Sequence, residues 1–346
     1  MAVFGVDLGG TKLAVAVFRE SGEILDRKVT PLAGRSGRDV GALIVKEIAE
    51  LMDGGGQAGG NAGSQAGGRC RKDAGASNAT FATFGGEQVT GIGISVPGIY
   101  RAARGTVWAP NIPGWDDYPL LDEVSRTVAD NGIRVRIDSD RACYILGEAW
   151  LGAASGCSNA IFLAVGTGIG AGVLCDGRVI RGHGDIAGAV GWMSLNPDYR
   201  EEYASCGYFE YHASGAGIVK SARDLLEMEP GMQSVLRSKK VSEISTQDVF
   251  EASEAGDPAA ARVIGDALRC WGMAVANLVS TFNPEKIIFG GGVFGPAANY
   301  LDDIAAEAQK WAQPISMQQV RLEKSQLGGD AGLIGAGKLG LGEKLA

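Results

Sequence analysis

The chain has 346 residues, more than one hydrophobic core usually organises, so two domains or one large domain are expected. Apolar residues make up 45% and charged residues 21%, a balance that excludes disordered, collagenous and disulfide-stapled proteins. With 32 basic against 40 acidic side chains the net charge is −8, so the protein as a whole should repel nucleic acid and anionic membranes. Any phosphate site must therefore be local.

The cysteines and the first residues point to a cellular compartment. The six cysteines form no CxxC pair, which indicates free or buried thiols in a reducing environment. The first residues lack a basic region, and no stretch approaches the roughly 18 apolar residues of a membrane span. We expect a cytoplasmic protein with no membrane or nucleic-acid partner.

The first predicted element is a hairpin, with strands over 3–8 and 12–18 joined by a Gly-Gly-Thr turn. Its segment DLGGTK places a carboxylate, two glycines, a hydroxyl and an ammonium around one turn. Glycines let backbone N–H groups approach phosphate oxygens, and Asp7 can hold a magnesium ion or its waters. A purely structural turn is the alternative. The candidate phosphate-binding residues are Gly9, Gly10, Thr11 and Lys12.

A helix is predicted over 39–52, and a strand over 89–96. Between them lies a glycine-rich segment, 53–86, that cannot bury enough apolar surface to offset its backbone entropy. We expect it to be a flexible insertion in a helix-to-strand loop.

The next elements lead to a candidate general base. A helix over 119–131, a strand over 134–137 and a helix over 141–151 are predicted, with Asp138-Ser139-Asp140 between the last two. A carboxylate at a strand end can accept a proton from a substrate hydroxyl, so Asp140 is the candidate base. The alternative is that Asp138 or Asp140 serves only as a helix N-cap.

A second hairpin is predicted, with strands over 160–165 and 173–175 around the glycine turn 166–172. A dinucleotide-binding turn would open a helix, whereas a strand follows here, so that interpretation is disfavoured. A second phosphate-binding tip, with Thr167 as donor, is favoured over a structural turn. Its candidate residues are Gly166, Thr167, Gly168 and Gly170.

Further on, a long helix is predicted over 259–282, and a strand over 286–289 enters three glycines. Gly291 and Gly292 there would let a nucleobase or ribose approach the backbone. The alternation of helix and strand indicates an α/β fold. Because each half opens with a strand, a glycine turn and a strand, the chain looks duplicated, with both glycine tips expected at a shared cleft.

Several motifs occur together in a recognisable order. They are DLGGTK at 7–12, SVPG at 95–98, NIPGW at 111–115, DSD at 138–140 with LGE at 146–148, GTGIGAG at 166–172, the strand and glycines at 286–292, and DAGLIGA at 330–336. In order and approximate spacing they resemble the ROK family, nearly end to end.

The resemblance implies a fold and an activity. The fold is the two-domain actin-like ATPase fold of sugar kinases, with ATP in the cleft between the domains. The expected domains are a small N-terminal one, 1–118, completed by about 331–346, and a large one, 119–330. The implied activity is ATP- and magnesium-dependent phosphorylation of a hexose or sugar-like polyol, often at the 6-hydroxyl. The resemblance also allows a homodimer.

The resemblance assigns roles to individual residues. Asp140 matches the catalytic aspartate, the two glycine turns match the phosphate loops, and Gly291 and Gly292 match part of the adenosine site. Gly98, Asn111 and Glu210 match positions on the sugar side.

The departures from the family pattern concern the acceptor and zinc sites. The usual Glu and His of AGExGH are Ala189 and Trp192 here, and Ser139 replaces the asparagine before the catalytic aspartate. Of the cysteine-rich zinc segment only Cys206 remains, so no structural zinc is expected. An indole can cover the CH face of a ring, so we expect an acceptor other than plain glucose, bound with help from Ser139 and Trp192.

A sugar-sensing regulator or retired kinase is the alternative function, since the family also contains repressors. Those carry a DNA-binding domain ahead of the first glycine hairpin. Here Asp7 is near the start and the charge is acidic, so DNA binding is disfavoured.

Overall fold

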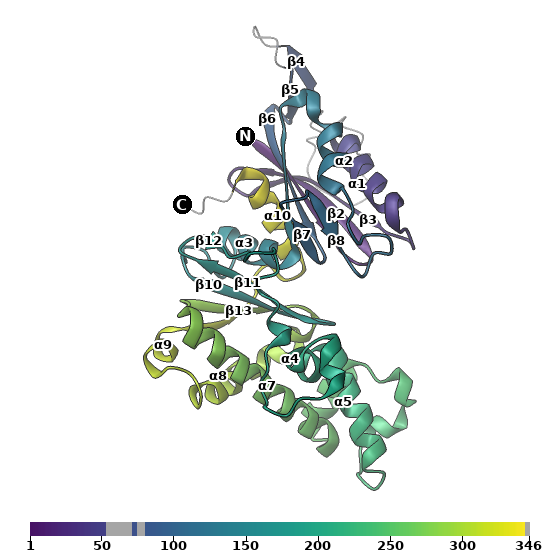
Figure 1. Cartoon of the computed structure of the whole chain (residues 1–346), viewed down its shortest axis with the longest axis vertical. Helices are drawn as coiled ribbons and strands as arrows, with labels where there is room; N and C mark the ends of the chain where they lie inside the picture. The colour runs from purple at the N-terminus through teal and green to yellow at the C-terminus, as the bar shows by residue number, and fades with distance from the viewer. Residues whose placement is uncertain (53–70, 75–79, 343–346) are drawn as a thin grey trace. The chain divides into compact units, whose positions relative to one another are not determined.

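The computed structural model describes residues 1–52, 71–74 and 80–342 (Figure 1). Contacts divide it into two compact units. The first comprises Met1–Ser155, Arg181–Ala187 and Gly329–Ala346, and the second comprises Gly156–Ile180 and Gly188–Gly328. Each unit has its own mixed sheet and hydrophobic core, which confirms the α/β class.

The sheet of the first unit has the strand order β3-β2-β1-β6-β5-β4, and β9 also pairs with β6. β1 and β2 form the predicted first hairpin, while β6 and β9 continue the sheet in parallel. The strands are β1 (Ala2–Leu8), β2 (Lys12–Arg19), β3 (Ile24–Pro31), β4 (Arg71–Ala74), β5 (Thr80–Phe84), β6 (Glu87–Val96) and β9 (Arg134–Ser139), with a separate pair β7 (Ile99–Arg101) and β8 (Thr106–Trp108).

The two faces of this sheet differ. Alternate residues of β1, such as Phe4 and Val6, join a core with α1 (Gly37–Met52) and α2 (Leu120–Thr127). The buried residues of α1 recur at helical spacing, as its sequence pattern predicts. A short 3₁₀ turn, Ala129–Asn131, follows α2.

The opposite face is lined by glycines and carries α10 (Ala331–Leu341), which packs against α3 (Asp140–Leu151). A methyl group added at Gly5 would lie 2.8 Å from the Gly337 nitrogen, and one at Gly93 would lie 1.9 Å from the Ala336 oxygen. The helix therefore lies directly on β1 and β6, which puts a late segment of the chain among the earliest strands (Figure 1).

Part of the glycine-rich segment forms strands. β4 pairs with β5, and β5 pairs with the start of β6, so these residues extend the sheet. The physical reason lies in apolar residues that the composition hides: Ala82 and Phe84 are buried, and Phe84 makes an edge-on ring contact with Phe4. The expectation of a loop is therefore wrong for 71–74 and 80–84, which are strands, while 53–70 and 75–79 lie outside the described residues. The flexibility of the insertion stays a prediction.

The second unit has the strand order β12-β11-β10-β13-β14. Its strands are β10 (Ala160–Val165), β11 (Ile169–Cys175), β12 (Arg178–Val179), β13 (Lys286–Gly290) and β14 (Arg321–Lys324). Its helices are α4 (Tyr208–Ala213), α5 (Gly215–Met228), α6 (Thr246–Glu254), α7 (Pro258–Phe282), α8 (Leu301–Gln309) and α9 (Pro314–Gln319). Short 3₁₀ segments join them, including η2 (Val190–Trp192).

The two sheets repeat one arrangement. In each, the first two strands form an antiparallel hairpin, and the first strand also pairs in parallel with a later strand. That later strand pairs in parallel with one further strand, which is β9 in the first unit and β14 in the second. This supports the duplication inferred from the two glycine hairpins.

The unit boundaries differ from the expected domains. Residues 119–155 belong to the first unit, because β9 is part of its sheet and α3 packs on α10. The segment Arg181–Ala187 also belongs to the first unit, although the residues on either side of it belong to the second.

Candidate functional site

A row of polar side chains crosses the first sheet near the carboxyl ends of three parallel strands. Asp7 of β1 lies opposite Ser95 of β6, which lies opposite Asp138 of β9. Because the strands are parallel and in register, the three side chains share one face. That face carries α10, since a methyl group at Gly332 would lie 2.7 Å from Asp7 Oδ1. The carboxyl ends of parallel strands are where α/β sheets bind ligands.

Asp7, the candidate magnesium ligand, lies in a polar but partly buried setting. Burial raises its pKa, while the Ser95 side chain and the Lys12 charge lower it. The Asp330 carboxylate adds to the rise, and Arg27 holds that carboxylate through hydrogen bonds of 2.8 and 2.6 Å. A desolvated carboxylate that faces a second negative charge is stabilised by a cation.

The turn after Asp7 presents its tip to solvent. The Gly9 N–H donates to the Lys12 oxygen at 2.9 Å and closes the turn. Gly10, Thr11 and Lys12 are exposed, so these predicted phosphate-binding groups are accessible to a ligand.

Asp140 is the first residue of α3, but it does not cap the helix. The N-cap is Ser139, whose hydroxyl accepts the Ala142 N–H at 3.3 Å. The alternative that Asp140 serves only as N-cap is therefore wrong. Ser139, a predicted substrate contact, is itself buried and uses its side chain in this cap.

The surroundings of Asp140 suit a base. Its Oδ1 accepts the Arg141 N–H at 2.7 Å. Burial raises its pKa to about 6, with a further rise from Asp7 and opposing effects of Arg141 and Tyr144. A carboxylate with this pKa is more basic than an ordinary aspartate and is still ionised at neutral pH.

Asp138 has a different role from Asp140. Its Oδ2 accepts from Arg181 Nε at 2.8 Å and Nη2 at 2.5 Å, and its Oδ1 accepts the Ser139 N–H at 2.8 Å. Arg181 opens the Arg181–Ala187 segment, so this ion pair fixes that segment beside the strand that ends at the candidate base. Neither the pairing nor Arg181 was predicted from the sequence.

The two predicted sugar-side residues of the first unit lie in well-defined loops. Gly98 has φ +130°, and a methyl group there would lie 2.2 Å from the Trp108 oxygen, so only glycine fits. Asn111 is exposed, with its Nδ2 3.2 Å from where a Gly10 methyl group would lie. Trp115 anchors this loop: it is buried and donates to the Gly37 oxygen at 2.9 Å.

In the second unit the glycine turn is shorter than predicted. It comprises only 166–168, and the Gly166 N–H donates to the Gly168 oxygen at 2.9 Å. Thr167 lies exposed at its tip. Gly170 is buried in β11 opposite Ala164, so its assignment to the turn is wrong. The turn ends early because Ile169 already pairs with Val165 in the ladder.

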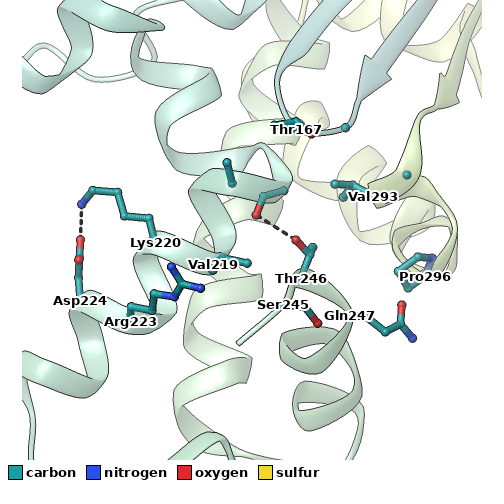
Figure 2. A pocket seen from close by; sticks show the side chains of 14 residues that line it. Thr167, Val219, Lys220, Arg223, Asp224, Ser245, Thr246, Gln247, Val293 and Pro296 are labelled. Atoms are coloured by element: carbon teal, nitrogen blue, oxygen red, sulfur yellow. Dashed lines mark hydrogen bonds and ion pairs between the residues drawn. The ribbon is translucent and has the colours of Figure 1, made fainter. Parts of the chain in front are cut away.

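A pocket of about 860 Å³ lies beside this turn (Figure 2). Its wall comprises Gly166 and Thr167, the first turns of α5, the segment 245–247, and residues after β13 from Gly292 to Pro296. The volume is that of a site for a small molecule or cofactor. Gly291 has φ +89° and lies against the Val165 oxygen. This left-handed residue follows the end of β13 and turns the chain toward the pocket wall.

Several pocket residues were not predicted from the sequence. Thr246 donates to the Gly215 oxygen at 3.0 Å (Figure 2). Arg223 donates to the oxygens of Ser242 and Ile244 at 2.9 and 3.0 Å. These bonds join α5 to the loop before α6. No local motif marks them, since each depends on segments that meet only in the fold.

Glu210 lies on α4, and its carboxylate reaches the glycine turn. Its Oε2 accepts the Ile169 N–H at 2.6 Å. Burial raises its pKa, and the Ile169 N–H lowers it. The predicted sugar-side carboxylate therefore also contacts the backbone of the candidate phosphate turn.

Trp192 and Ala189 belong to η2 and its N-cap, and the Trp192 side chain is 58% exposed. An indole this exposed is available to a ligand. Near the expected zinc segment, Cys206 is partly buried and the Tyr203 hydroxyl lies 3.0 Å from His212 Nε2. The absence of structural zinc stays a prediction.

The described residues, 1–52, 71–74 and 80–342, contain no group of three or more His, Cys, Asp or Glu side chains arranged to hold a metal ion. Among the same residues, no helix is both long and apolar enough to cross a bilayer.

One family profile and several known proteins are similar to this chain in sequence. The sequence profile of the ROK family matches residues 79–342. The glucokinase of Halalkalibacterium halodurans is 31% identical over 341 residues, covering 97% of this chain and 93% of that protein. The xylose repressor of Caldicellulosiruptor bescii is 34% identical over 207 residues, 58% of this chain and 50% of that protein.

A solved structure agrees with this assignment. The ROK family glucokinase from Streptomyces griseus, in complex with glucose and AMPPNP, is 28% identical and superimposes with a TM-score of 0.71 over 99% of each chain. The two-unit α/β architecture is thus that of actin-like ATPases. The chain belongs to the ROK family.

Proposed function

We propose that this ROK-family sugar kinase transfers the γ-phosphoryl group of ATP to a hydroxyl, the 6-hydroxyl or its equivalent, of a hexose or sugar-like polyol. The observation that carries the proposal is Asp140: a carboxylate at the end of a parallel strand, with a pKa of about 6, in the same unit as Asp7 and the first glycine turn. Phosphoryl transfer needs a base of this kind beside groups that bind phosphate.

Each unit has its own candidate nucleotide-binding residues. In the first unit, the backbone of Gly9 and Gly10 and the side chains of Thr11 and Lys12 bind phosphate. In the second, Gly166, Thr167 and Gly168 bind phosphate, and the pocket with Gly291 and Gly292 takes the nucleoside. The relative with bound AMPPNP supports ATP as the donor.

Asp7 fits a magnesium ion that arrives with ATP. Magnesium is commonly bound by one or two carboxylates together with substrate phosphates and waters, so a single desolvated aspartate is sufficient. The pKa of Asp7 is raised by burial and by Asp330, so a cation would relieve an unfavourable setting. When bound, the ion would neutralise charge on the phosphates.

The chain's own residues perform the remaining steps. Asp140 accepts the proton of the acceptor hydroxyl as the hydroxyl oxygen bonds to the γ-phosphorus of ATP. The bond from that phosphorus to the bridging oxygen breaks, and ADP leaves. Lys12 and the turn N–H groups stabilise the charge on the transferred group. Gly98 and Asn111 are proposed to contact the acceptor on the first unit, and Trp192 and Glu210 on the second.

We expect an acceptor preference that differs from plain glucose. Ala189 and Trp192 stand where the family pattern has a glutamate and a histidine, so two polar side chains are missing and an exposed indole ring is added. The test measures kcat/KM with ATP for hexoses, hexosamines, anhydrosugars and cyclitols. The double variant Ala189→Glu, Trp192→His should raise the ratio of kcat/KM for glucose to kcat/KM for the preferred acceptor by about tenfold. Trp311→His, at another exposed tryptophan, should leave the ratio unchanged. A wild-type preference for glucose over all others would contradict the prediction.

The pH dependence should report Asp140. The base works only when ionised, so kcat/KM should rise with pH, with a midpoint at the pKa of about 6. Below that value protonation of Asp140 should reduce the rate. Initial rates with the preferred acceptor at saturating ATP measure this limb. The same limb in the residual activity of Asp140→Asn would assign the titration to another group.

A sugar-sensing regulator is the second candidate, and the match to a xylose repressor favours it. Sugar and ATP binding without turnover on any acceptor of the panel would support this candidate over the kinase.

A further inference from the structure

Three segments of the second unit meet at the Glu210 carboxylate. One is the start of β11, directly after the candidate phosphate turn, where Oε2 accepts the Ile169 N–H at 2.6 Å. Another is η2, where Gly191 packs against the Glu210 side chain. The third is α4, which carries Glu210 itself. A half-buried carboxylate thus fixes the end of a turn that is otherwise exposed at its tip.

Two glycines leave the space that the carboxylate fills. A methyl group at Gly168 would lie 2.7 Å from Glu210 Oε2, and its three nearest neighbours all belong to Glu210. A methyl group at Gly191 would lie 3.1 Å from the same oxygen but also 2.8 Å from the backbone oxygen of Ile169. The carboxylate is therefore packed against the turn as well as hydrogen-bonded to it.

We propose that Glu210 is a positioning residue for the nucleotide: it holds the Gly166–Gly168 turn in the conformation that binds phosphate. The inference rests on the proposed function, because it takes this turn as part of the ATP site. It is additional to the acceptor contact proposed above: the same carboxylate would also order the turn that binds the nucleotide.

Glu210 restricts the backbone conformations that the turn can adopt. Within the turn a single bond joins Gly166 and Gly168, and outside it the Gly215 N–H donates to the Gly166 oxygen at 2.8 Å, so the Gly168 end depends on the contact with Glu210. Glycine backbones have many alternative conformations. The bond from the Ile169 N–H to a charged acceptor is among the stronger hydrogen bonds in proteins. Without it, the turn must be ordered when the nucleotide binds, which weakens affinity.

The experiment measures the Kd of ADP by calorimetry and the KM of the acceptor by turnover. Glu210→Ala should weaken ADP binding about tenfold, the effect of losing one charged hydrogen bond. Glu210→Gln should stay within about twofold of the wild type, because its amide oxygen can accept the same N–H. Glu227→Ala, at an exposed glutamate on α5, is the matched control and should bind ADP normally.

A glycine pair provides a second test. Gly168→Ala should displace the carboxylate and weaken ADP binding to a similar extent as Glu210→Ala. The double variant should be no worse than either single one, because both remove the same bond. Gly191→Ala is the contrast: its collision with the Ile169 oxygen remains after Glu210→Ala, so its effect should persist in that background.

The outcomes separate this inference from the proposed function. If the wild type binds ADP and Glu210→Ala binds it equally while the acceptor KM rises, the positioning role is wrong and Glu210 acts on the sugar. Additive losses in the Gly168→Ala, Glu210→Ala pair would also overturn it. A wild type that binds ADP yet phosphorylates nothing on the panel contradicts the kinase proposal. In that case the Kd values of the wild type and of Glu210→Ala alone decide whether the positioning role is correct.

Discussion

Replacing Asp140 with asparagine should lower kcat by about 10²- to 10⁴-fold, the usual contribution of a general base. Asparagine keeps the shape of the side chain and can still accept the Arg141 N–H, but it cannot take the acceptor proton. The ADP affinity should change little, because Asp140 is proposed to act on the acceptor hydroxyl. Turnover with the preferred acceptor and calorimetric Kd values measure the two effects.

The control for this variant is Asp122→Asn, at an aspartate of α2 whose side chain is 69% exposed. It should keep wild-type turnover. Equal turnover in Asp140→Asn and the wild type would remove Asp140 from the mechanism. A folded Asp140→Asn protein, judged by an unchanged melting temperature, is needed for either conclusion.

The largest expected effect on stability is that of Gly335→Ala. A methyl group there would lie 1.7 Å from the backbone oxygen of Cys143, where α10 crosses α3, and a backbone atom cannot move aside cheaply. The helices must separate, so we expect a loss of more than about 4 kcal/mol or a failure to fold. Urea unfolding of the purified variants gives the free energy of unfolding.

Gly265→Ala is the matched control, since it makes the same change inside a helix. Nothing lies within 4 Å of a methyl group at Gly265 in α7, so alanine should stabilise the helix by about 0.5–1 kcal/mol. The two variants should therefore shift stability in opposite directions. A Gly335→Ala protein as stable as the wild type would show that α10 and α3 do not pack as closely as described.

The sequence predicted those helices and turns that are determined by residues close to one another in the chain. Both glycine hairpins, the amphipathic α1 and the long α7 follow from turn residues and apolar spacing within one segment, and the structure contains all of them. The strand-end position of Asp140 was visible for the same reason. The strands at 71–74 and 80–84 could not be predicted from a glycine-rich composition, because buried Ala82 and Phe84 are stabilised by a sheet that the composition does not show.

Pairings between distant segments could not be predicted. The Asp138–Arg181 ion pair, the Glu210–Ile169 hydrogen bond and the walls of the pocket join residues that no local pattern connects. The placement of 119–155 in the first unit likewise depends on β9 joining β6, which is a tertiary contact. The spacing of apolar residues indicates that a segment is a strand, but it does not show which strand is its neighbour in the sheet.

The place of α10 in the chain has a consequence for biosynthesis. α10 covers the face of the first sheet that carries Asp7, Ser95 and Asp138, yet it comes after the whole second unit in the sequence. Domains generally fold as they leave the ribosome, N-terminal first. Here the first unit to be synthesised is the last to be completed. Its glycine-lined face stays uncovered while the second unit is translated, and the Asp330 carboxylate at the start of α10 reaches Asp7 only when that helix emerges.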